Sequence, residues 1–336
     1  MTAKIRPSKG APYARILGVG GYRPTRVVPN EVILEHIDSS DEWIRSRSGI
    51  ASRHWAGPDE TVAEMSLEAA GKAIADAGIS ASDIDAVVVA TVSHFMQTPA
   101  VATEIAHRIG AGKPAAFDVS AGCAGFTYGL TLAKSMVVDG SAGHVLVIGV
   151  ERLSDLTDKE DRATAFLFGD GAGAVVVGPS QVPAIGPAVW GSEGDKAETI
   201  KQTVPWDLYR DARPDEIRFP AITQEGQAVF RWAVYEMAKV AQEALDAAGI
   251  TADQLDAFIP HQANMRIIDS MIKALKLPDH VAVARDIETT GNTSAASIPL
   301  AMERLLATGA AKSGDTALVI GFGAGLVYAA TVVTLP

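Results

Sequence analysis

Two stretches of the chain, about half its length apart, repeat one pattern of apolar and polar positions. Residues 76–89, "DAGISASDIDAVVV", and 247–260, "AAGITADQLDAFIP", each indicate the end of an amphipathic helix, a glycine stop, a short connection and a buried strand. Asp85 in the first corresponds to Asp256 in the second, an offset of 171 residues (256 − 85). The apolar runs "VLVIGV" and "ALVIGF" follow at nearly the same offset. A repeat this long predicts two duplicated domains, because solenoids repeat every 20–50 residues or so.

Apolar strands alternate with amphipathic helices in both halves, which predicts an α/β fold with layered sheets and mostly parallel strand pairing. We expect an N-terminal half over 1–180 and a C-terminal half over 181–336. The uncharged stretch 317–336 is about long enough to cross a bilayer. Its glycines and β-branched residues instead predict two buried strands joined by a glycine turn. The irregular stretch 194–221 predicts a long surface loop.

Composition narrows the classes of function. The 336-residue chain has a formal net charge of −11, which argues against non-specific nucleic-acid binding and requires a local basic patch for any acidic partner. Its single cysteine excludes an intrachain disulfide framework and a cysteine-rich metal site, and it is typical of a reducing compartment. The basic N-terminal segment lacks an apolar core and cleavage site, so we expect no signal peptide and a cytoplasmic protein.

The single cysteine, Cys123, lies in "FDVSAGCAGFTYGL" between a predicted strand over 115–120 and a predicted helix over 124–140. A free cysteine is often a small buried hydrophobe. At a strand-to-helix turn, however, unpaired N–H groups and the helix dipole favour a thiolate, and such thiols have pKa values of roughly 3.5–7.5. The neighbouring glycines leave the sulfur open to a bulky reactant. The position therefore indicates a nucleophile with a lowered pKa.

Two polar residues at similar strand ends are candidate partners of the thiol. His261 ends an apolar strand and precedes an evident helix, and Asn292 lies in the glycine bend "GNTSAAS". Functional groups in α/β sheets collect at such carboxyl ends of strands. Cys123 and Asn292 are 169 residues apart (292 − 123), so they hold similar places in the two repeats and should meet near the axis between them. The three residues form a predicted Cys/His/Asn set.

Papain-like peptidases also use Cys, His and Asn, so a cysteine hydrolase stays open, although the chain lacks the peptidase signature around its cysteine and the matching fold pattern. No two histidines have the spacing of metal ligands, and we expect no metal site. The glycine-rich segments "GDGAGA" (169–174) and "GFGAGL" (321–326) both miss the GxGxxG spacing and precede β-branched runs. They predict tight strand turns rather than nucleotide-binding loops.

The duplicated halves together with "DVSAGCAGF", "PHQAN", "GNTSAAS" and "GFGAG" resemble β-ketoacyl-acyl-carrier-protein synthase III, of the thiolase-like superfamily. The resemblance runs from about residue 13 to the C-terminus and is closest to the actinobacterial branch. It implies a thiolase-like fold of five layers, α-β-α-β-α. Elongating ketosynthases use Cys, His and His, whereas this sequence has Asn292 where the second His would fall.

The resemblance implies a condensing enzyme that starts type II fatty-acid synthesis. Cys123 would take the acyl group of a short acyl-CoA, acetyl or branched such as isobutyryl, and malonyl-acyl-carrier-protein would then lose CO₂ and attack the acyl-Cys to give a 3-oxoacyl product. His261 and Asn292 would donate hydrogen bonds to the thioester oxygen as charge grows on it. The oxyanion hole of the acyl-Cys would use the N–H groups of Cys123 and Ala324, where many members have a glycine. No metal or redox cofactor is implied.

The resemblance also implies binding residues and partners. By family position, CoA would contact Trp43, Arg47, Arg162 and Asn264, and the acyl pocket would include Gln97, Thr98 and Phe322. Acyl-carrier-protein would dock on Arg231, Arg266 and Lys273, with Lys276 on the same helix. The implied assembly is a homodimer in which the partner supplies the pocket-closing Thr98. A priming ketosynthase or acyltransferase of a polyketide pathway, and a catalytically dead partner subunit, are the other functions that this resemblance leaves open.

Overall fold

The repeat seen in the sequence corresponds to two five-stranded sheets of identical topology. The computed structural model describes residues 5–213 and 216–336. The first sheet has the order β1-β7-β6-β4-β5, and the second has the order β8-β14-β13-β11-β12. The strands of the first sheet are β1 (Tyr13–Tyr22), β4 (Ala86–Ala90), β5 (Ala115–Val119), β6 (Val145–Arg152) and β7 (Asp170–Ser180). Those of the second are β8 (Val189–Gly191), β11 (Ala257–Pro260), β12 (Ala282–Val283), β13 (Thr316–Gly323) and β14 (Val327–Thr334).

Strand pairing in each sheet is half parallel and half antiparallel, so the expectation of mostly parallel pairing was wrong. β4 pairs in parallel with β5 and β6, while β7 runs antiparallel to β6 and β1. The second sheet repeats this arrangement strand for strand. A three-residue turn joins β13 to β14, and a connection this short cannot make the crossover that parallel strands require.

The two repeats agree down to individual hydrogen bonds. The backbone N–H of Asp85 donates to the carbonyl of His144 at 2.9 Å, and that of Asp256 donates to the carbonyl of Thr316 at 2.9 Å. Each carboxylate also accepts a backbone N–H at the start of the neighbouring strand. Asp85 accepts that of Gly143 at 2.7 Å, and Asp256 accepts that of Thr316 at 2.8 Å. These bonds fix each strand against its neighbour at the same point. The domain boundary near residue 180 stays a prediction.

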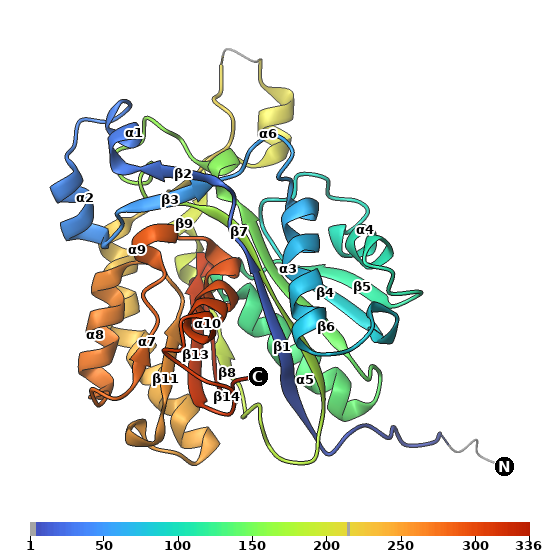
Figure 1. Cartoon of the computed structure of the whole chain (residues 1–336). Helices are drawn as coiled ribbons and strands as arrows, with labels where there is room; N and C mark the ends of the chain where they lie inside the picture. Colours follow the sequence, from blue (N-terminus) through green and yellow to red (C-terminus); the bar gives the residue numbers. More distant parts are fainter. Residues whose placement is uncertain (1–4, 214–215) are drawn as a thin grey trace.

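Helices complete five layers, as the resemblance implied (Figure 1). α3 (Val62–Asp76) and α4 (Val101–Arg108) cover the outer face of the first sheet, and α7 (Gly226–Ala248) and α8 (Met265–Leu275) cover that of the second. α5 (Gly125–Asp139) and α10 (Ser297–Ala307) lie between the sheets, where buried side chains of both sheets pack on them. The central layer therefore holds both sheets in one continuous core.

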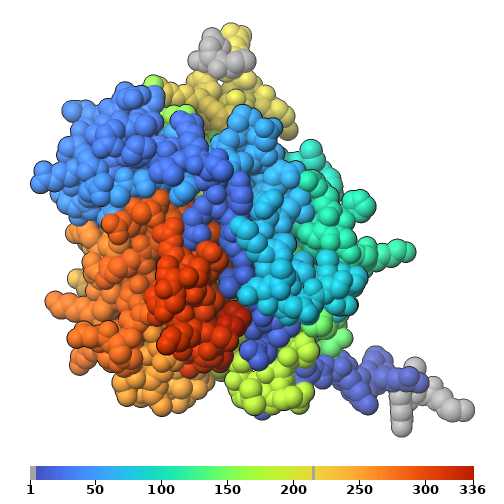
Figure 2. All heavy atoms as spheres, in the orientation of Figure 1, coloured from blue at the N-terminus to red at the C-terminus, as the bar shows by residue number. Residues whose placement is uncertain are grey.

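A smaller cap lies over one end of these layers. It contains the two-stranded sheet of β2 (Arg26–Pro29) and β3 (Ser52–Trp55), with α1 (Asn30–Leu34), α2 (Asp41–Ser48) and α9 (Ile287–Thr290). In Figure 2 the blue N-terminal part of this cap packs directly on orange segments of the C-terminal half. The apolar core beneath it combines residues from both, among them Ile44, Trp55 and Ile268. The cap thus ties the two ends of the chain together.

The stretch 194–221 is more regular than the predicted surface loop. It contains β9 (Ile200–Gln202) and α6 (Trp206–Asp211), and β9 pairs with β10 (Ile222–Gln224). The N–H of Thr203 donates to the carbonyl of Ala221 at 2.8 Å, which extends the pairing. Residues 214–215 lie outside the described part of the chain. Seven short 3-10 helices complete the described elements: η1 (Ala81–Asp83), η2 (Gly122–Ala124), η3 (Leu153–Leu156), η4 (Gly194–Thr199), η5 (Ala252–Gln254), η6 (Ser294–Ala296) and η7 (Ala324–Leu326).

The two glycine-rich segments have different structures. "GFGAGL" ends β13 and forms the turn to β14, as predicted, and Gly325 has a left-handed φ of 77°. "GDGAGA" lies mostly inside β7, so the prediction of a turn was wrong there. A Cβ on Gly173 would lie 2.7 Å from the Pro299 side chain, so the glycine lets α10 pack against the strand. Among the described residues, no helix is both long and apolar enough to span a bilayer.

Candidate active site

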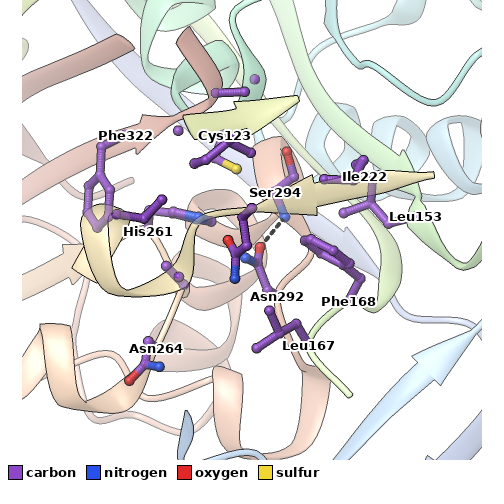
Figure 3. A pocket seen from close by; sticks show the side chains of 18 of the residues that line it. Cys123, Leu153, Leu167, Phe168, Ile222, His261, Asn264, Asn292, Ser294 and Phe322 are labelled. Carbon is purple, nitrogen blue, oxygen red and sulfur yellow. Dashed lines mark hydrogen bonds between the residues drawn. The ribbon is translucent and has the colours of Figure 1, made fainter. Parts of the chain in front are cut away.

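Cys123 lies at the predicted strand-to-helix turn. β5 ends at Val119, η2 carries the cysteine, and α5 begins at Gly125. Gly122 adopts a left-handed φ of 50°, and a Cβ there would lie 3.2 Å from the backbone N of Ala324. Glycine therefore allows the turn to approach η7 of the other repeat. The side chain of Cys123 is partly exposed to a pocket and points into it (Figure 3).

The thiol does not have the lowered pKa expected from its place before a helix. Burial raises the pKa of Cys123 to about 12, and the nearby carboxylate of Glu151 raises it further, while the Ser294 side chain opposes both. The loss of hydration outweighs the helix N-terminus because the sulfur is surrounded by protein atoms. A thiol in this environment needs a group that removes its proton when it attacks.

His261 follows the last residue of β11, so the sheet fixes its position. Its backbone N–H donates to the carbonyl of Ile320 at 2.7 Å. Its ring Nδ1 lies 2.7 Å from the hydroxyl of Ser297, and the ring of Phe322 packs edge-on at 5.3 Å between centroids. Burial lowers the pKa of His261 to about 3, so the imidazole is neutral at physiological pH. When the Ser297 hydroxyl donates to Nδ1, the ring proton is on Nε2 and is available to the pocket.

Asn292 is held by hydrogen bonds on its side chain and on its backbone. Its side-chain oxygen accepts the backbone N–H of Ser294 at 2.9 Å, which leaves its NH₂ group to donate (Figure 3). Its backbone N–H donates to the carbonyl of Leu167 at 2.9 Å, and its carbonyl accepts the N–H of Gly169 at 3.0 Å. The amide is thus presented as a hydrogen-bond donor with a fixed orientation.

These three predicted residues line one pocket, which lies where the two repeats meet. The cavity volume is about 220 Å³, and its lining is mainly apolar. Predicted residues Asn264, Phe322 and Ala324 also line it. Much of the apolar lining comes from η3, the segment before β7, β10, α7 and α8, among them Leu153, Leu156, Leu167, Phe168, Ile222, Val229, Phe230 and Ile267. A cavity of this size and polarity suits a short acyl chain beside a thiol.

Ala324 begins the turn that lies beside Cys123. A Cβ on the preceding Gly323 would lie 2.7 Å from the backbone N of Cys123 and 3.0 Å from its sulfur. Three described non-glycine residues have a positive φ, and Ala324 is not among them. Alanine therefore fits this position without backbone strain, and the backbone N–H groups of residues 123 and 324 come from turns in contact with each other.

Trp43 and Arg47, on α2 of the cap, form a cluster with Arg162 next to the pocket. The guanidinium of Arg162 lies 5.0 Å from the centre of the Trp43 ring, and that of Arg47 lies 6.0 Å from it. The Asn264 side chain donates to the carbonyl of Arg47 at 2.9 Å, and its oxygen accepts the N–H of Arg266 as the N-cap of α8. Asn264 therefore joins this cluster to the pocket that it lines.

The predicted basic residues form an exposed surface on α7 and α8. Arg231, Arg266, Lys273 and Lys276 are all exposed. The guanidinium of Arg266 lies 4.7 Å from the centre of the Phe230 ring, and Phe230 lines the pocket. The basic surface thus begins at the pocket wall.

Gln97 and Thr98 do not line the pocket of their own chain. Both are exposed in the segment between β4 and α4. Their predicted place in the acyl pocket depends on a second subunit and stays a prediction.

Three polar residues near the thiol were missed by the sequence analysis. Glu151 is fully buried at the end of β6, Ser294 lines the pocket, and Ser297 contacts His261. A charged residue directly after the apolar run "VLVIGV" was a usable signal, because a carboxylate in a buried strand needs a partner. Among the residues that the structure describes, no group of three His, Cys, Asp or Glu side chains has an arrangement suited to a metal ion.

Comparisons with known proteins agree on one family. A family model described as 3-oxoacyl-[acyl-carrier-protein (ACP)] synthase III matches residues 117–194, and a model of its C-terminal part matches 245–335. The β-ketoacyl-[acyl-carrier-protein] synthase III 1 of Streptomyces coelicolor is 82% identical, covering 99% of this chain and 100% of the relative. The mycobacterial enzyme of Mycobacterium avium is 55% identical, with 99% of each chain covered.

Solved structures of similar proteins have the same fold. The priming β-ketosynthase from the R1128 polyketide biosynthetic pathway superimposes with a TM-score of 0.95 at 47% identity, covering 100% of this chain and 99% of that one. The 3-oxoacyl synthase III of Thermus thermophilus gives a TM-score of 0.88 at 38% identity, covering 96% and 99%. The chain therefore belongs to the 3-oxoacyl-[acyl-carrier-protein] synthase III family, in its actinobacterial branch, and is a condensing enzyme that transfers acyl groups.

Proposed function

We propose that this enzyme condenses a short acyl-CoA with malonyl-acyl-carrier-protein through an acyl-Cys123 intermediate, as the first condensation of type II fatty-acid synthesis. The supporting observation is that Cys123, His261 and Asn292 line one pocket although they come from three separate elements. The proposed steps require no metal or redox cofactor.

In the first half-reaction the sulfur of Cys123 attacks the acyl-CoA thioester and CoA leaves. The backbone N–H groups of Cys123 and Ala324 stabilise the tetrahedral oxyanion, which suits the close approach of η2 and η7. Removal of one such donor from an oxyanion hole typically lowers the rate by about 10²–10³. A covalent intermediate formed in this way gives ping-pong kinetics.

In the second half-reaction malonyl-acyl-carrier-protein loses CO₂, and the resulting enolate attacks the acyl-Cys. His261 and Asn292 donate hydrogen bonds to the thioester oxygen while negative charge develops on it. The low pKa of His261 suits this role, because the ring is neutral at physiological pH. With its proton on Nε2, the neutral ring donates a hydrogen bond to the thioester oxygen. The side-chain amide of Asn292 suits it because its oxygen is already occupied by Ser294.

The acyl-CoA reaches the thiol from the side of the cap. We assign the adenine to Trp43 and Arg162, with Arg47 and Asn264 toward the pantetheine arm. The Arg162 guanidinium lies 5.0 Å from the centre of the Trp43 ring. An adenine stacked between the two side chains needs a wider separation than this. Because Arg162 is exposed, its side chain can move away from the ring when the base enters.

The carrier protein docks on the basic surface of Arg231, Arg266 and Lys273. This chain has a net charge of −11, and an acidic carrier would be repelled over most of its surface. Exposed cations next to the pocket wall give an acidic partner a favourable place to bind. A carrier bound there would deliver its pantetheine arm past Phe230.

Primer choice would be set by the partner subunit of a homodimer. We propose that Thr98, with Gln97 beside it, closes the acyl pocket across the dimer interface, and that Phe322 forms the wall beside His261. Threonine leaves more room than an aromatic side chain, so branched primers such as isobutyryl would be accepted as well as acetyl.

A priming ketosynthase or acyltransferase of a polyketide pathway is the second candidate. The observation in its favour is the R1128 priming β-ketosynthase, which has the same fold over the whole chain. The two functions differ in the acceptor, so turnover with fatty-acid and polyketide carrier proteins, each loaded with malonate, separates them.

The proposed chemistry is tested by intact-protein mass after mixing with acetyl-, isobutyryl- and octanoyl-CoA. We expect a single acyl adduct on the wild type and none on Cys123→Ala, and malonyl-carrier-protein should then discharge the adduct as a 3-oxoacyl product. An adduct lost to water without malonyl-dependent condensation would indicate a hydrolase. The absence of any adduct would contradict the proposal and favour a non-catalytic subunit.

A further inference from the structure

Glu151 is a carboxylate buried beside the thiol and unused by the mechanism above. It is the last residue but one of β6 and has no exposed surface. None of the salt bridges among the described residues includes it. One carboxylate oxygen accepts the Ser93 hydroxyl at 2.6 Å and the N–H of Val92 at 3.1 Å, with Thr91 at 3.4 Å. The other oxygen accepts the Ser294 hydroxyl at 3.1 Å. A buried carboxylate without a counter-ion is costly, so its place next to the thiol points to a function.

Ser294 connects this carboxylate to the reacting groups. Its backbone N–H donates to the Asn292 side chain at 2.9 Å. Ser294 and Cys123 line the same pocket on turns that touch each other, and the sulfur is directed toward Ser294 in Figure 3. The Ser294 side chain also opposes the rise in the pKa of the Cys123 thiol. Ser294 also has a left-handed φ of 48°, which is uncommon for a residue with a side chain. A residue in this backbone conformation thus lines the pocket of the thiol while its hydroxyl donates to Glu151.

We propose that Ser294 and Glu151 form a proton relay for Cys123, and that Glu151 holds the thiol proton while the acyl-enzyme exists. The proposal rests on the proposed function of Cys123 as nucleophile. Glu151 is a positioning residue here, because it acts on the thiol through the hydroxyl of Ser294.

Atoms and charges balance over the two half-reactions. In the first, the S–H proton of Cys123 passes to the hydroxyl of Ser294, whose own proton passes to Glu151. The sulfur bonds to the thioester carbon, and CoA leaves as a thiolate that takes a proton from solvent. In the second, the enolate carbon attacks the acyl group, the carbon–sulfur bond breaks, and the Cys123 thiolate recovers the proton from Glu151 through Ser294.

The acid–base properties of the pocket suit this assignment. Burial raises the pKa of Glu151 to about 7, whereas burial lowers that of His261 to about 3, so the carboxylate is the better proton acceptor near neutral pH. Cys123 is the titratable group that acts on Glu151 from the turn packed against it, and the other groups in contact with the carboxylate are hydroxyls and a backbone N–H. A protonated Glu151 also removes a negative charge from behind the pocket while the enolate forms.

The test is the rate of acyl-Cys123 formation from acyl-CoA, followed by rapid quench and intact mass between pH 5.5 and 9. Glu151→Gln keeps the shape of the side chain without a basic oxygen, and Ser294→Ala interrupts the relay. We expect both to lower the rate by about 10²–10⁴ and to remove a rise in rate centred near pH 7. Glu151→Asp should restore part of the rate together with that rise.

Asp170→Asn is the matched control. Asp170 is also fully buried and accepts hydrogen bonds from a serine, Ser154, and from the N–H of Ala56, but it does not contact Ser294. The control should keep the rise near pH 7. If Glu151→Gln fails to fold, as judged by thermal melting, Ser294→Ala tests the relay alone.

Two results would overturn the relay while leaving the proposed function intact. One is an acyl adduct formed by Glu151→Gln or Ser294→Ala at the wild-type rate. The other is a lower rate with an unchanged pH profile, which indicates a purely structural role. If the wild type itself forms no adduct at Cys123, the proposed function fails and the relay fails with it.

Discussion

Because Gly323 lies so close to Cys123, adding one methyl group at residue 323 tests whether the position of the thiol controls acylation. A Cβ at residue 323 would lie 2.7 Å, 2.8 Å and 3.0 Å from the backbone N, Cβ and sulfur of Cys123. Favourable contacts lie at about 3.5–4.0 Å, so Cys123 would have to retreat by about 0.7 Å in Gly323→Ala. The opposite side of the turn leaves little space, because a Cβ on Gly125 would lie 2.9 Å from Ala90. The φ of Gly323 is −178°, which alanine adopts freely, so the effect is steric.

We expect Gly323→Ala to lose about 1–3 kcal/mol of unfolding free energy through overpacking, and to form the acyl-enzyme about 10²-fold more slowly, since a displacement near 1 Å misaligns the nucleophile. Urea denaturation and rapid-quench intact mass with isobutyryl-CoA measure the two effects. Gly71→Ala on α3 is the matched control, because its new Cβ meets no atom within 4 Å. That variant should gain about 0.5–1 kcal/mol and acylate normally. Acylation of Gly323→Ala at the wild-type rate would refute the steric reasoning.

The remaining predictions concern charge and fit. The unfolded imidazole of His261 titrates near 6.5 and the buried one near 3, so the unfolded state binds more protons between these values, and stability should decrease as pH falls below 6.5. Urea denaturation at pH 7 and 5 should show a smaller loss for His261→Gln, and an equal loss would contradict the assignment. Arg266→Glu should raise KM for malonyl-carrier-protein far more than for acyl-CoA, with exposed Lys9→Glu as control; equal increases would argue against docking there. Thr98→Phe should narrow the primer range toward acetyl-CoA in a competition assay, and an unchanged range would remove Thr98 from the acyl pocket.

The sequence predicted the features that depend on local patterns. The strand and helix around Cys123 and the hairpin of β13 and β14 follow from apolar runs and glycine stops. The equivalence of Asp85 and Asp256 was visible as a repeat, and the structure shows that both make the same backbone contacts. The repeat predicted that Cys123 and Asn292 would lie close together, and the strand end predicted that His261 would face a functional region; all three line one pocket.

Features that depend on tertiary surroundings were missed or misjudged. The position of Cys123 in the chain predicted a lowered pKa, but the burial that raises it comes from segments far away in sequence. "GDGAGA" was predicted to be a turn because it is rich in glycine. In the structure Gly171 and Gly173 instead leave room for α10 to pack against β7. The backbone pairing of 194–221 depends on β10, which lies beyond that stretch. Glu151 and Ser297 stand next to functional residues only after folding.

Equivalent turns of the two repeats, η2 with Cys123 and η6 after Asn292, touch each other at the pocket. In a symmetric pair of unfused half-length chains, the same residue would occupy both turns, and a thiol would face a second thiol. Fusion into one polypeptide removes that constraint, because each copy of the turn can then mutate independently. In the function proposed above, one copy of the turn supplies the nucleophile and the other supplies the hydrogen-bond donor. The asymmetry of the proposed site thus lies within two repeats of the same topology.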